Sequence, residues 1–227
     1  MTDANQKPTV LIVDDDPDVR EALQCLLRSV GLESRAIASP PKYMQSELPS
    51  GPTCLVLDVR LPGRSGLELQ RELSAANIDV PIIFMTGHGD VPMSVQAMKA
   101  GAIEFLIKPF RDQDLLDAIH LGLARDRARL ERERGLDALR ERYDSLTARE
   151  REVMEHVVRG RMNKQIAGDI GISEMTVKIH RGNMTRKMRA PSVADLARMA
   201  DRLSAAGLLR QIQKHQPKHG AQVEQLA

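Results

Sequence analysis

Apolar runs and helical patterns alternate along the first half of the chain. Short apolar runs that end at turn or charged residues are typical of buried parallel strands. Five of them occur, at residues 9–13, 33–37, 53–58, 80–85 and 103–107. Helical spacing of apolar residues follows each run, opening at Pro17, after Pro40 and Pro41, near residue 65, near residue 91 and from residue 111. This alternation predicts a doubly wound parallel sheet built from five strand-helix units.

The pattern changes to one long helix over residues 115–143. Apolar positions recur there at helical spacing, and the segment between them mixes both signs of charge densely. This is typical of a solvated linker helix, and a short coiled coil is the alternative. The heptad phase does not carry through residues 133–135, so Gly135 is a candidate break or hinge.

The last third of the chain has helical spacing only. A capping box at Thr147 and Glu150 opens a first helix. A second short helix spans residues 163–170, and after a glycine turn Ser173 caps a third helix over residues 174–188 with an exposed basic face. Two short helices joined by such a turn predict a helix-turn-helix.

Charge is distributed unevenly between these parts. Residues 1–124 hold 11 basic and 17 acidic side chains, a net charge of −6, which leaves +8 for residues 125–227. An acidic half joined to a basic half suggests two domains, the second of which meets a polyanion. The expected division is a first domain over 1–125, a helical linker over 126–144, a helix-turn-helix domain over 145–208 and a flexible tail over 209–227.

Neither membrane nor redox chemistry is indicated. No apolar run approaches the roughly 18 residues of a membrane span, and the first residues lack the apolar segment of a secretory signal. A cytoplasmic location is the default expectation. Cys25 and Cys54 have neither metal-ligand nor redox spacing, so both are expected to be buried small hydrophobes.

Chemistry-bearing residues follow the predicted strands. Asp14, Asp15, Asp58, Thr86 and Lys108 all lie where a strand ends. The carboxyl ends of parallel strands face one crevice, so these side chains should gather there. Clustered carboxylates repel one another unless a cation is present, and Mg²⁺ prefers oxygen ligands. A carboxylate beside such a metal can attack a phosphoryl group, whose oxygens a lysine and a hydroxyl would then bind.

The first 125 or so residues resemble the receiver domain of two-component response regulators. The matching motifs are VDDD at 13–16, LDVRLPGRSG at 57–66, MTGHGD at 85–90 and EFLIKPF at 104–110. The resemblance implies a flavodoxin-like fold in which Asp58 accepts a phosphoryl group from a sensor histidine kinase. It also implies a cis peptide bond between Lys108 and Pro109.

The resemblance assigns further roles around Asp58. Asp15 would bind Mg²⁺ directly, Asp14 would assist through water, and Asp58 and the Arg60 carbonyl would complete the ligand set. Thr86 would swing toward the phosphoryl group and Lys108 would pair with it. Phe105 stands at the aromatic position that turns inward on activation in this family.

The last third resembles the LuxR-type DNA-binding domain of the NarL and FixJ subfamily. The match includes LTARERE at 146–152, GRMNKQIA at 160–167 and ISEMTVKIHRGNMTRKM at 172–188. The resemblance implies that the third helix enters the major groove of DNA and that a helix over 192–205 pairs two copies. The implied contacts to bases or phosphates are Lys164, Thr176, Lys178, Ile179, Arg181 and Lys187. Met175, Met184 and Gly182 depart from the family pattern, and Gly182 replaces a base-contacting lysine of some relatives.

Together these features predict a phosphorylation-controlled DNA-binding transcription regulator. Phosphorylation would promote dimerisation or domain release, and RNA polymerase is a candidate partner at the promoter. The only catalysis expected is Mg²⁺-dependent self-phosphorylation and autodephosphorylation. Two alternatives stay open: an aspartate-based phosphatase acting on a small substrate, and an adaptor whose basic helices bind a protein or RNA.

Overall fold

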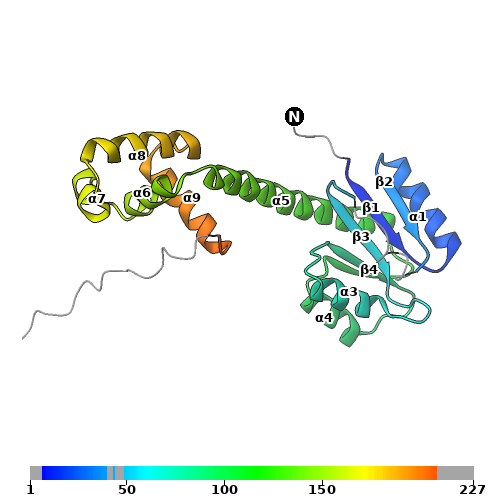
Figure 1. The fold of residues 1–227 in the computed structure, drawn as a ribbon. Helices are drawn as coiled ribbons and strands as arrows, with labels where there is room; N and C mark the ends of the chain where they lie inside the picture. Colours follow the sequence, from blue (N-terminus) through cyan, green and yellow to red (C-terminus); the bar gives the residue numbers. More distant parts are fainter. Residues whose placement is uncertain (1–6, 40–42, 44–48, 209–227) are drawn as a thin grey trace, which may run out of the picture. The chain divides into compact units, whose positions relative to one another are not determined.

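The computed structural model describes residues 7–39, 43 and 49–208. The chain divides into two compact units, Met1–Glu131 and Arg132–Ala227, here called the N-terminal unit and the C-terminal unit. Figure 1 shows a sheet with flanking helices in the first unit and helices alone in the second. The helix expected after Pro40 and Pro41 lies outside the described residues, except for Tyr43, which is helical.

The N-terminal unit contains a sheet of five parallel strands in the order β2-β1-β3-β4-β5. The strands are β1 (Thr9–Val13), β2 (Glu33–Ile37), β3 (Thr53–Asp58), β4 (Ile82–Thr86) and β5 (Glu104–Ile107). This order is the flavodoxin-like doubly wound one, so the predicted fold class is confirmed. Thr86 is the last residue of β4, whereas the sequence pattern had placed it just beyond the strand.

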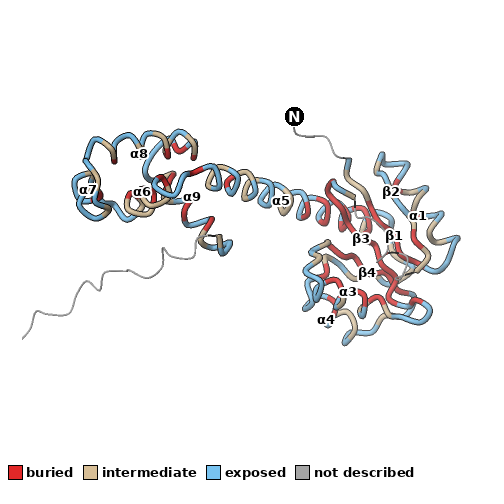
Figure 2. Tube along the Cα trace, in the orientation of Figure 1, coloured by how far each residue is buried: buried red, intermediate tan, exposed pale blue. Residues whose placement is uncertain are grey.

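Among the described helices, two pack against each face of the sheet. Alternate strand residues, such as Leu11 and Leu57, join a core with α3 (Gly66–Ala75) and α4 (Val91–Lys99). Their neighbours along the strands join a second core with α1 (Pro17–Ser29) and α5 (Asp112–Asp144). The three central strands β1, β3 and β4 are buried on both faces, as Figure 2 shows, which explains why they are almost continuously apolar in sequence. The edge strands β2 and β5 are partly exposed.

Helix α5 is fastened to the beginning of β3 by two of its residues. The Asp126 carboxylate is only 1% exposed and accepts hydrogen bonds from the Thr53 amide and from Arg129 Nε, both at 2.8 Å. One turn earlier, a Cβ on Gly122 would lie 2.6 Å from Cys54 Sγ, so only glycine allows this close packing. The helix is therefore held against the strand that ends in Asp58.

Two expectations from the sequence are wrong. Gly135 does not break the linker, because α5 runs without interruption from Asp112 to Asp144. A glycine inside a helix costs only about 1 kcal/mol, which the surrounding turns offset. Cys25 is exposed, while Cys54 is buried as expected. The buried positions of α1 are Leu23 and Leu27, and a residue midway between them points to the opposite side of the helix.

In its described residues, the C-terminal unit contains four helices after α5. They are α6 (Ala148–Val158), α7 (Asn163–Ile170), α8 (Glu174–Met188) and α9 (Val193–Ala205). Their shared core includes Val153, Ile166, Val177 and Leu196, together with Leu139 from the end of α5. The all-helical fold expected here is confirmed. The division between the units falls inside the expected linker, while the four-segment boundaries remain a prediction.

Candidate functional site

The carboxyl edge of the sheet brings together side chains from three strand ends. Lys108, just after β5, places its Nζ 2.8 Å from Asp14 Oδ2 and 2.8 Å from Asp58 Oδ2. Asp14 is 1% exposed, Asp58 is 7% exposed, and Thr86 at the end of β4 is fully buried. The side-chain contacts therefore join three of the five residues that were expected to gather, and Thr86 is linked to Lys108 through the backbone. Asp15 is exposed, beside this cluster in sequence.

Backbone contacts hold these strand ends in place. The Lys108 amide donates to the Thr86 carbonyl at 2.7 Å, and the Val59 amide donates to the Met85 carbonyl at 3.0 Å. Gly66 opens α3 directly against β3, where an added Cβ would lie 2.4 Å from the Asp58 carbonyl oxygen. A side chain at this position would push α3 away from the acidic residue, so the close approach requires glycine.

Each carboxylate is also bonded to the backbone of its own loop. Asp14 Oδ1 accepts from the Asp16 amide at 2.9 Å, and Asp58 Oδ1 accepts from the Arg60 amide at 2.8 Å. These bonds occupy one oxygen of each carboxylate. The other oxygen of each points to the same cation, the Lys108 ammonium.

The electrostatics of the cluster favour additional positive charge. Burial raises the pKa of Asp14, and the charge of Asp58 adds to this, although the hydrogen bonds from Lys108 and from the Asp16 amide oppose it. Burial lowers the pKa of Lys108, but its bonds to Asp14 and Asp58 outweigh burial and hold the pKa above the ordinary value. The single positive charge of Lys108 thus balances only part of the negative charge of the two carboxylates.

These donors fit a hard divalent cation such as Mg²⁺. The fit rests on the convergence of Asp14 and Asp58 on one cation position and on the raised pKa of Asp14. Across residues 7–39, 43 and 49–208, however, no three acidic, histidine or cysteine side chains are already grouped to hold a metal. Both Asp15 and Arg60 are exposed, so they can be reached by solvent ions.

Thr86 and Phe105 both adjoin Gly89. Thr86 Oγ1 accepts from the His88 amide at 3.2 Å. Phe105, in β5, is half-buried, and its ring lies 6.2 Å from that of Phe84 between centroids. Its other neighbour is Gly89, where an added Cβ would lie 2.9 Å from Phe105 Cε1. The position of the Phe105 ring therefore depends on the absence of a side chain at Gly89.

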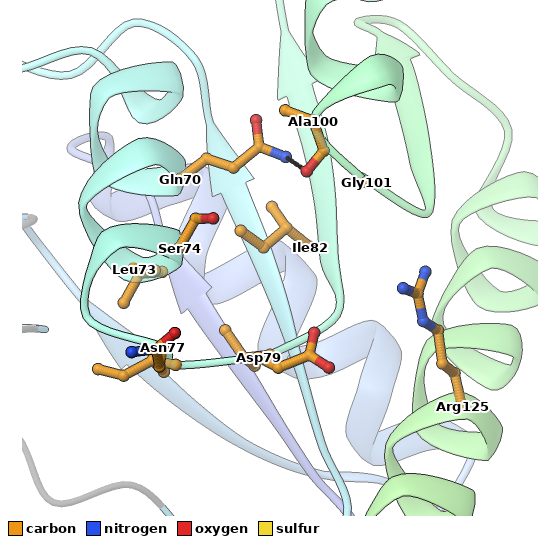
Figure 3. Close-up of a pocket in the computed structure, with 11 residues that line it drawn as sticks. Gln70, Leu73, Ser74, Asn77, Asp79, Ile82, Ala100, Gly101 and Arg125 are labelled. Carbon is orange, nitrogen blue, oxygen red and sulfur yellow. Dashed lines mark hydrogen bonds between the residues drawn. The ribbon is translucent and has the colours of Figure 1, made fainter. Parts of the chain in front are cut away.

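A separate cavity lies at the opposite edge of the sheet. Figure 3 shows its lining, with Gln70 Nε2 donating to the Ala100 carbonyl at 3.2 Å and Asp79 and Arg125 on its other sides. The cavity of about 310 Å³ adjoins Ile82, where β4 begins. It shares no residue with the cluster of Asp14, Asp58 and Lys108.

The C-terminal unit has the geometry of a helix-turn-helix. Helix α7 ends at Gly171, whose φ of 69° is left-handed, and Ser173 then caps α8 by accepting from the Thr176 amide at 3.1 Å. Glycine is favoured at such a left-handed helix end. Val177, Met184 and Met188 face the core, as expected, which leaves the opposite face of α8 exposed.

The residues expected to contact DNA divide into two groups. Lys164, Lys178 and Ile179 are exposed. Thr176, Arg181 and Lys187 are half-buried and bonded within the unit. Their partners are Ser173 Oγ for the Thr176 hydroxyl at 2.7 Å, Asn163 Oδ1 for Arg181 Nη1 at 2.9 Å, and both Glu150 and Ser145 for Lys187.

The Lys187 contact ties α8 to the beginning of α6. Lys187 Nζ lies 2.6 Å from Glu150 Oε2 and 3.1 Å from the Ser145 carbonyl oxygen. Glu150 Oε2 also accepts from the Thr147 amide at 2.9 Å, which completes the expected capping box. Burial raises the pKa of Glu150, but Lys187 and the Thr147 amide outweigh burial and hold the pKa below its ordinary value.

Family comparisons match both units. Residues 10–120 match the response regulator receiver domain, and residues 144–200 match the bacterial regulatory proteins of the luxR family. The chain belongs to the DNA-binding response regulators. It is a phosphorylation-controlled transcription regulator rather than a catalytic enzyme, with a receiver domain that implies a histidine kinase and a LuxR-type domain that implies DNA.

Individual relatives cover most of this response regulator. Nodulation protein W of Bradyrhizobium diazoefficiens is 52% identical over 202 residues, covering 89% of each chain. Response regulator protein TmoT of Ectopseudomonas mendocina is 45% identical over 199 residues, covering 88% of this chain and 90% of its own. The solved structure of the response regulator StyR superposes with a TM-score of 0.79 at 49% identity, covering 86% of this chain and 98% of its own.

Some contacts of this response regulator were not expected from its sequence. The Asp126 contact with Thr53 and the Lys187 contact with Glu150 join residues that are 73 and 37 positions apart. Glu150 carried a local signal, its capping-box spacing, whereas Asp126 was one charge among many in a charged helix.

No helix in the described ranges is long and apolar enough to cross a membrane.

Proposed function

We propose that phosphorylation of Asp58 controls promoter binding by the C-terminal unit. The observation that carries this proposal is the bridge from Lys108 Nζ to Asp14 and Asp58 at the carboxyl edge of the sheet. It places a nearly buried carboxylate beside a cation that can bind phosphoryl oxygens. The same chain carries a helix-turn-helix on which this event can act.

The chemistry follows from the arrangement of the chain's own groups. An oxygen of Asp58 attacks the phosphorus of a phosphohistidine, the phosphorus–nitrogen bond breaks, and the imidazole leaves with the electron pair. Lys108 then transfers its hydrogen bond from Asp58 to a phosphoryl oxygen, and the buried Thr86 hydroxyl turns toward another. Mg²⁺ held by Asp14, Asp15, Asp58 and the Arg60 carbonyl would neutralise charge on the carboxylates and the phosphoryl group.

The response spreads from the ends of β4 and β5. When Thr86 and Lys108 move, the Phe105 ring turns inward and the surface of α4 and β5 changes. Phosphorylation then promotes dimerisation or release of the DNA-binding domain, with α9 pairing two copies. Two linked domains bind a two-fold site more tightly than one, because the second contact is intramolecular. A dimer bound in this way could meet RNA polymerase at the promoter.

The test compares Asp58→Asn with Asp79→Asn in the full chain. Asp79 is an exposed carboxylate at the cavity on the other edge of the sheet. With acetyl phosphate and Mg²⁺, wild type and Asp79→Asn should gain a phosphoryl group by intact mass, and chelation should prevent the gain. Asp58→Asn should gain none, and labelling of this variant at wild-type level would contradict the proposal.

A second measurement examines the output. Phosphorylated wild type should bind duplex DNA with a sequence preference and with an affinity that falls as salt rises. An adaptor should show no such preference. Repeated release of phosphate from small esters would instead indicate a phosphatase.

A further inference from the structure

One face of α8 is exposed along its whole length. It consists of residues spaced three or four apart, on the side opposite the buried residues Val177, Met184 and Met188. Figure 2 shows this helix with exposed turns along its outer side. The residues of the face are Met175, Lys178, Ile179, Gly182 and Arg186, here called the α8 face.

The α8 face combines two apolar tips with two cations. Met175 is 66% exposed and Ile179 is 55% exposed, while Lys178 and Arg186 supply positive charge. Gly182 adds no side chain, and a Cβ built there would meet nothing within 4 Å. Large apolar side chains on successive turns of a helix are costly to leave in water, so they indicate a contact surface.

Neutral hydrogen-bonding side chains near this face are already engaged. The Thr176 hydroxyl bonds to Ser173 Oγ at 2.7 Å, and Asn183 Oδ1 accepts from Arg186 Nη2 at 3.1 Å. The Thr176 hydroxyl and the Asn183 carbonyl oxygen are thus already bonded, while Lys178, Arg186 and the Asn183 amide group keep N–H donors for bases. The apolar tips add contacts that these donors cannot make.

Apolar tips can recognise only one feature of the major groove. Thymine alone among the four bases presents a methyl group there, at its C5 atom. The flanking cations favour DNA over an apolar protein partner, since the chain from residue 125 onward carries a net charge of +8. The N-terminal residues of a recognition helix are also those that approach base edges, and Met175 is the second residue of α8.

We infer that Met175, together with Ile179, selects binding sites by contact with thymine 5-methyl groups. This inference rests on the proposed DNA-binding function and adds a specificity-determining residue to it. The two side chains are one helical turn apart, with Cβ atoms about 5–6 Å from each other. Base pairs stack about 3.4 Å apart, so the two thymines lie within about two steps of one another. Lys178, one residue before Ile179, can donate to guanine.

The experiment removes one methyl group at a time. Duplexes are selected from a randomised pool with the phosphorylated full chain, and each thymine of the selected half-site is then replaced by deoxyuridine. Wild type should lose about fourfold in affinity at the thymine that Met175 contacts, the effect of returning one methyl group to water. Met175→Ala should bind thymine and deoxyuridine at this position equally well.

Met162→Ala is the matched control. Met162 is 68% exposed but lies before α7, off the α8 face, so its variant should keep the wild-type response to deoxyuridine. Ile179→Ala should remove the response at a different thymine. Because Met175 is exposed, its truncation should leave amide protection in the core helices unchanged.

The outcomes separate this inference from the function on which it rests. If wild type binds selected duplexes but responds to deoxyuridine at no position, methyl recognition is overturned while DNA binding stands. The same holds if Met175→Ala keeps the full wild-type response. If wild type shows no sequence preference among duplexes, the proposed function itself fails.

Discussion

Replacing Lys187 by methionine should destabilise the C-terminal unit selectively. The substitution keeps the aliphatic stem but removes the ammonium that lies 2.6 Å from Glu150 Oε2. The Glu150 side chain is 5% exposed, so its carboxylate would stay buried with Thr147 as its remaining partner. A buried charge that loses its partner has to be dehydrated without compensation.

The magnitude follows from the exposure of the pair. Breaking a fully buried ion pair costs about 3 to 5 kcal/mol. The Lys187 side chain is 32% exposed, so water already screens part of this interaction. We therefore expect a loss of about 1 to 2 kcal/mol, which corresponds to a roughly 5- to 30-fold change in the opening equilibrium.

The loss should depend on pH with a defined sign. In wild type the pKa of Glu150 lies below its ordinary value, so the pair stabilises the fold above that value and stops doing so as pH falls through the folded-state pKa. Without Lys187, burial alone would raise this pKa and penalise the charged form. The difference between wild type and variant should therefore be largest near neutral pH and shrink below about pH 4.

Hydrogen exchange measured by mass spectrometry on the full chain can test this. Peptides from α6 and α8 should lose protection in Lys187→Met, while peptides from β1 and β3 serve as an internal reference. Arg186→Met is the matched control, since it removes one positive charge from the same helix without touching Glu150. Equal protection in the two variants at neutral pH, or a difference that grows on acidification, would refute the argument.

DNA binding by the same variants tests the expectation that Lys187 contacts the DNA backbone. Log affinity falls as log salt rises, and each lysine that neutralises a phosphate makes this fall steeper by about 0.9. Removing such a lysine should therefore make the fall shallower by about 0.9. A lysine held by Glu150 should leave this slope unchanged in Lys187→Met. Glu150→Gln tests the same point from the other partner. This substitution frees the Lys187 ammonium for a phosphate, so the salt dependence of binding should not become weaker.

Two further predictions concern the receiver domain. Gly89→Ala should destabilise it by about 1 to 2 kcal/mol, because the new Cβ would lie 2.9 Å from the Phe105 ring. Gly87→Ala is the control and should not destabilise the domain, since nothing lies within 4 Å of a Cβ built there. Equal hydrogen exchange of the β4 and β5 amides in the two variants would contradict this prediction. A thiol reagent should label exposed Cys25 in the native protein, whereas Cys54 is buried and burial raises its pKa to about 12. Quantifying the two labelled peptides at neutral pH checks this, and equal rates would show that Cys54 is accessible.

Much of the fold follows from local patterns in the sequence. The five apolar runs and their turn residues indicate a parallel sheet because buried strands have no polar face. The strand ends then predict the cluster of Asp14, Asp58, Thr86 and Lys108, since parallel strands share one carboxyl edge. The helix-turn-helix follows in the same way from its capping residues and from the spacing of Val177, Met184 and Met188.

The linker shows where local patterns are insufficient. Gly135 interrupts the heptad phase, yet α5 continues through it, because packing and helix continuity outweigh the small penalty of one glycine. Cys25 was expected to be buried from its apolar neighbours, but the side of α1 that faces the sheet is set by Leu23 and Leu27. In both cases tertiary packing decides against the local signal.

The sequence by itself therefore determined the two domains, the sheet, the recognition helix and the residues at the strand ends. Only the tertiary structure decided how these side chains are paired: Lys108 with Asp14 across 94 positions, Lys187 with Glu150, and Asp126 with the start of β3. It also left Met175 and Ile179 uncovered on α8. The physical reason is that hydrophobic periodicity is a local property, whereas an ion pair or an exposed tip depends on which distant segments the fold brings together.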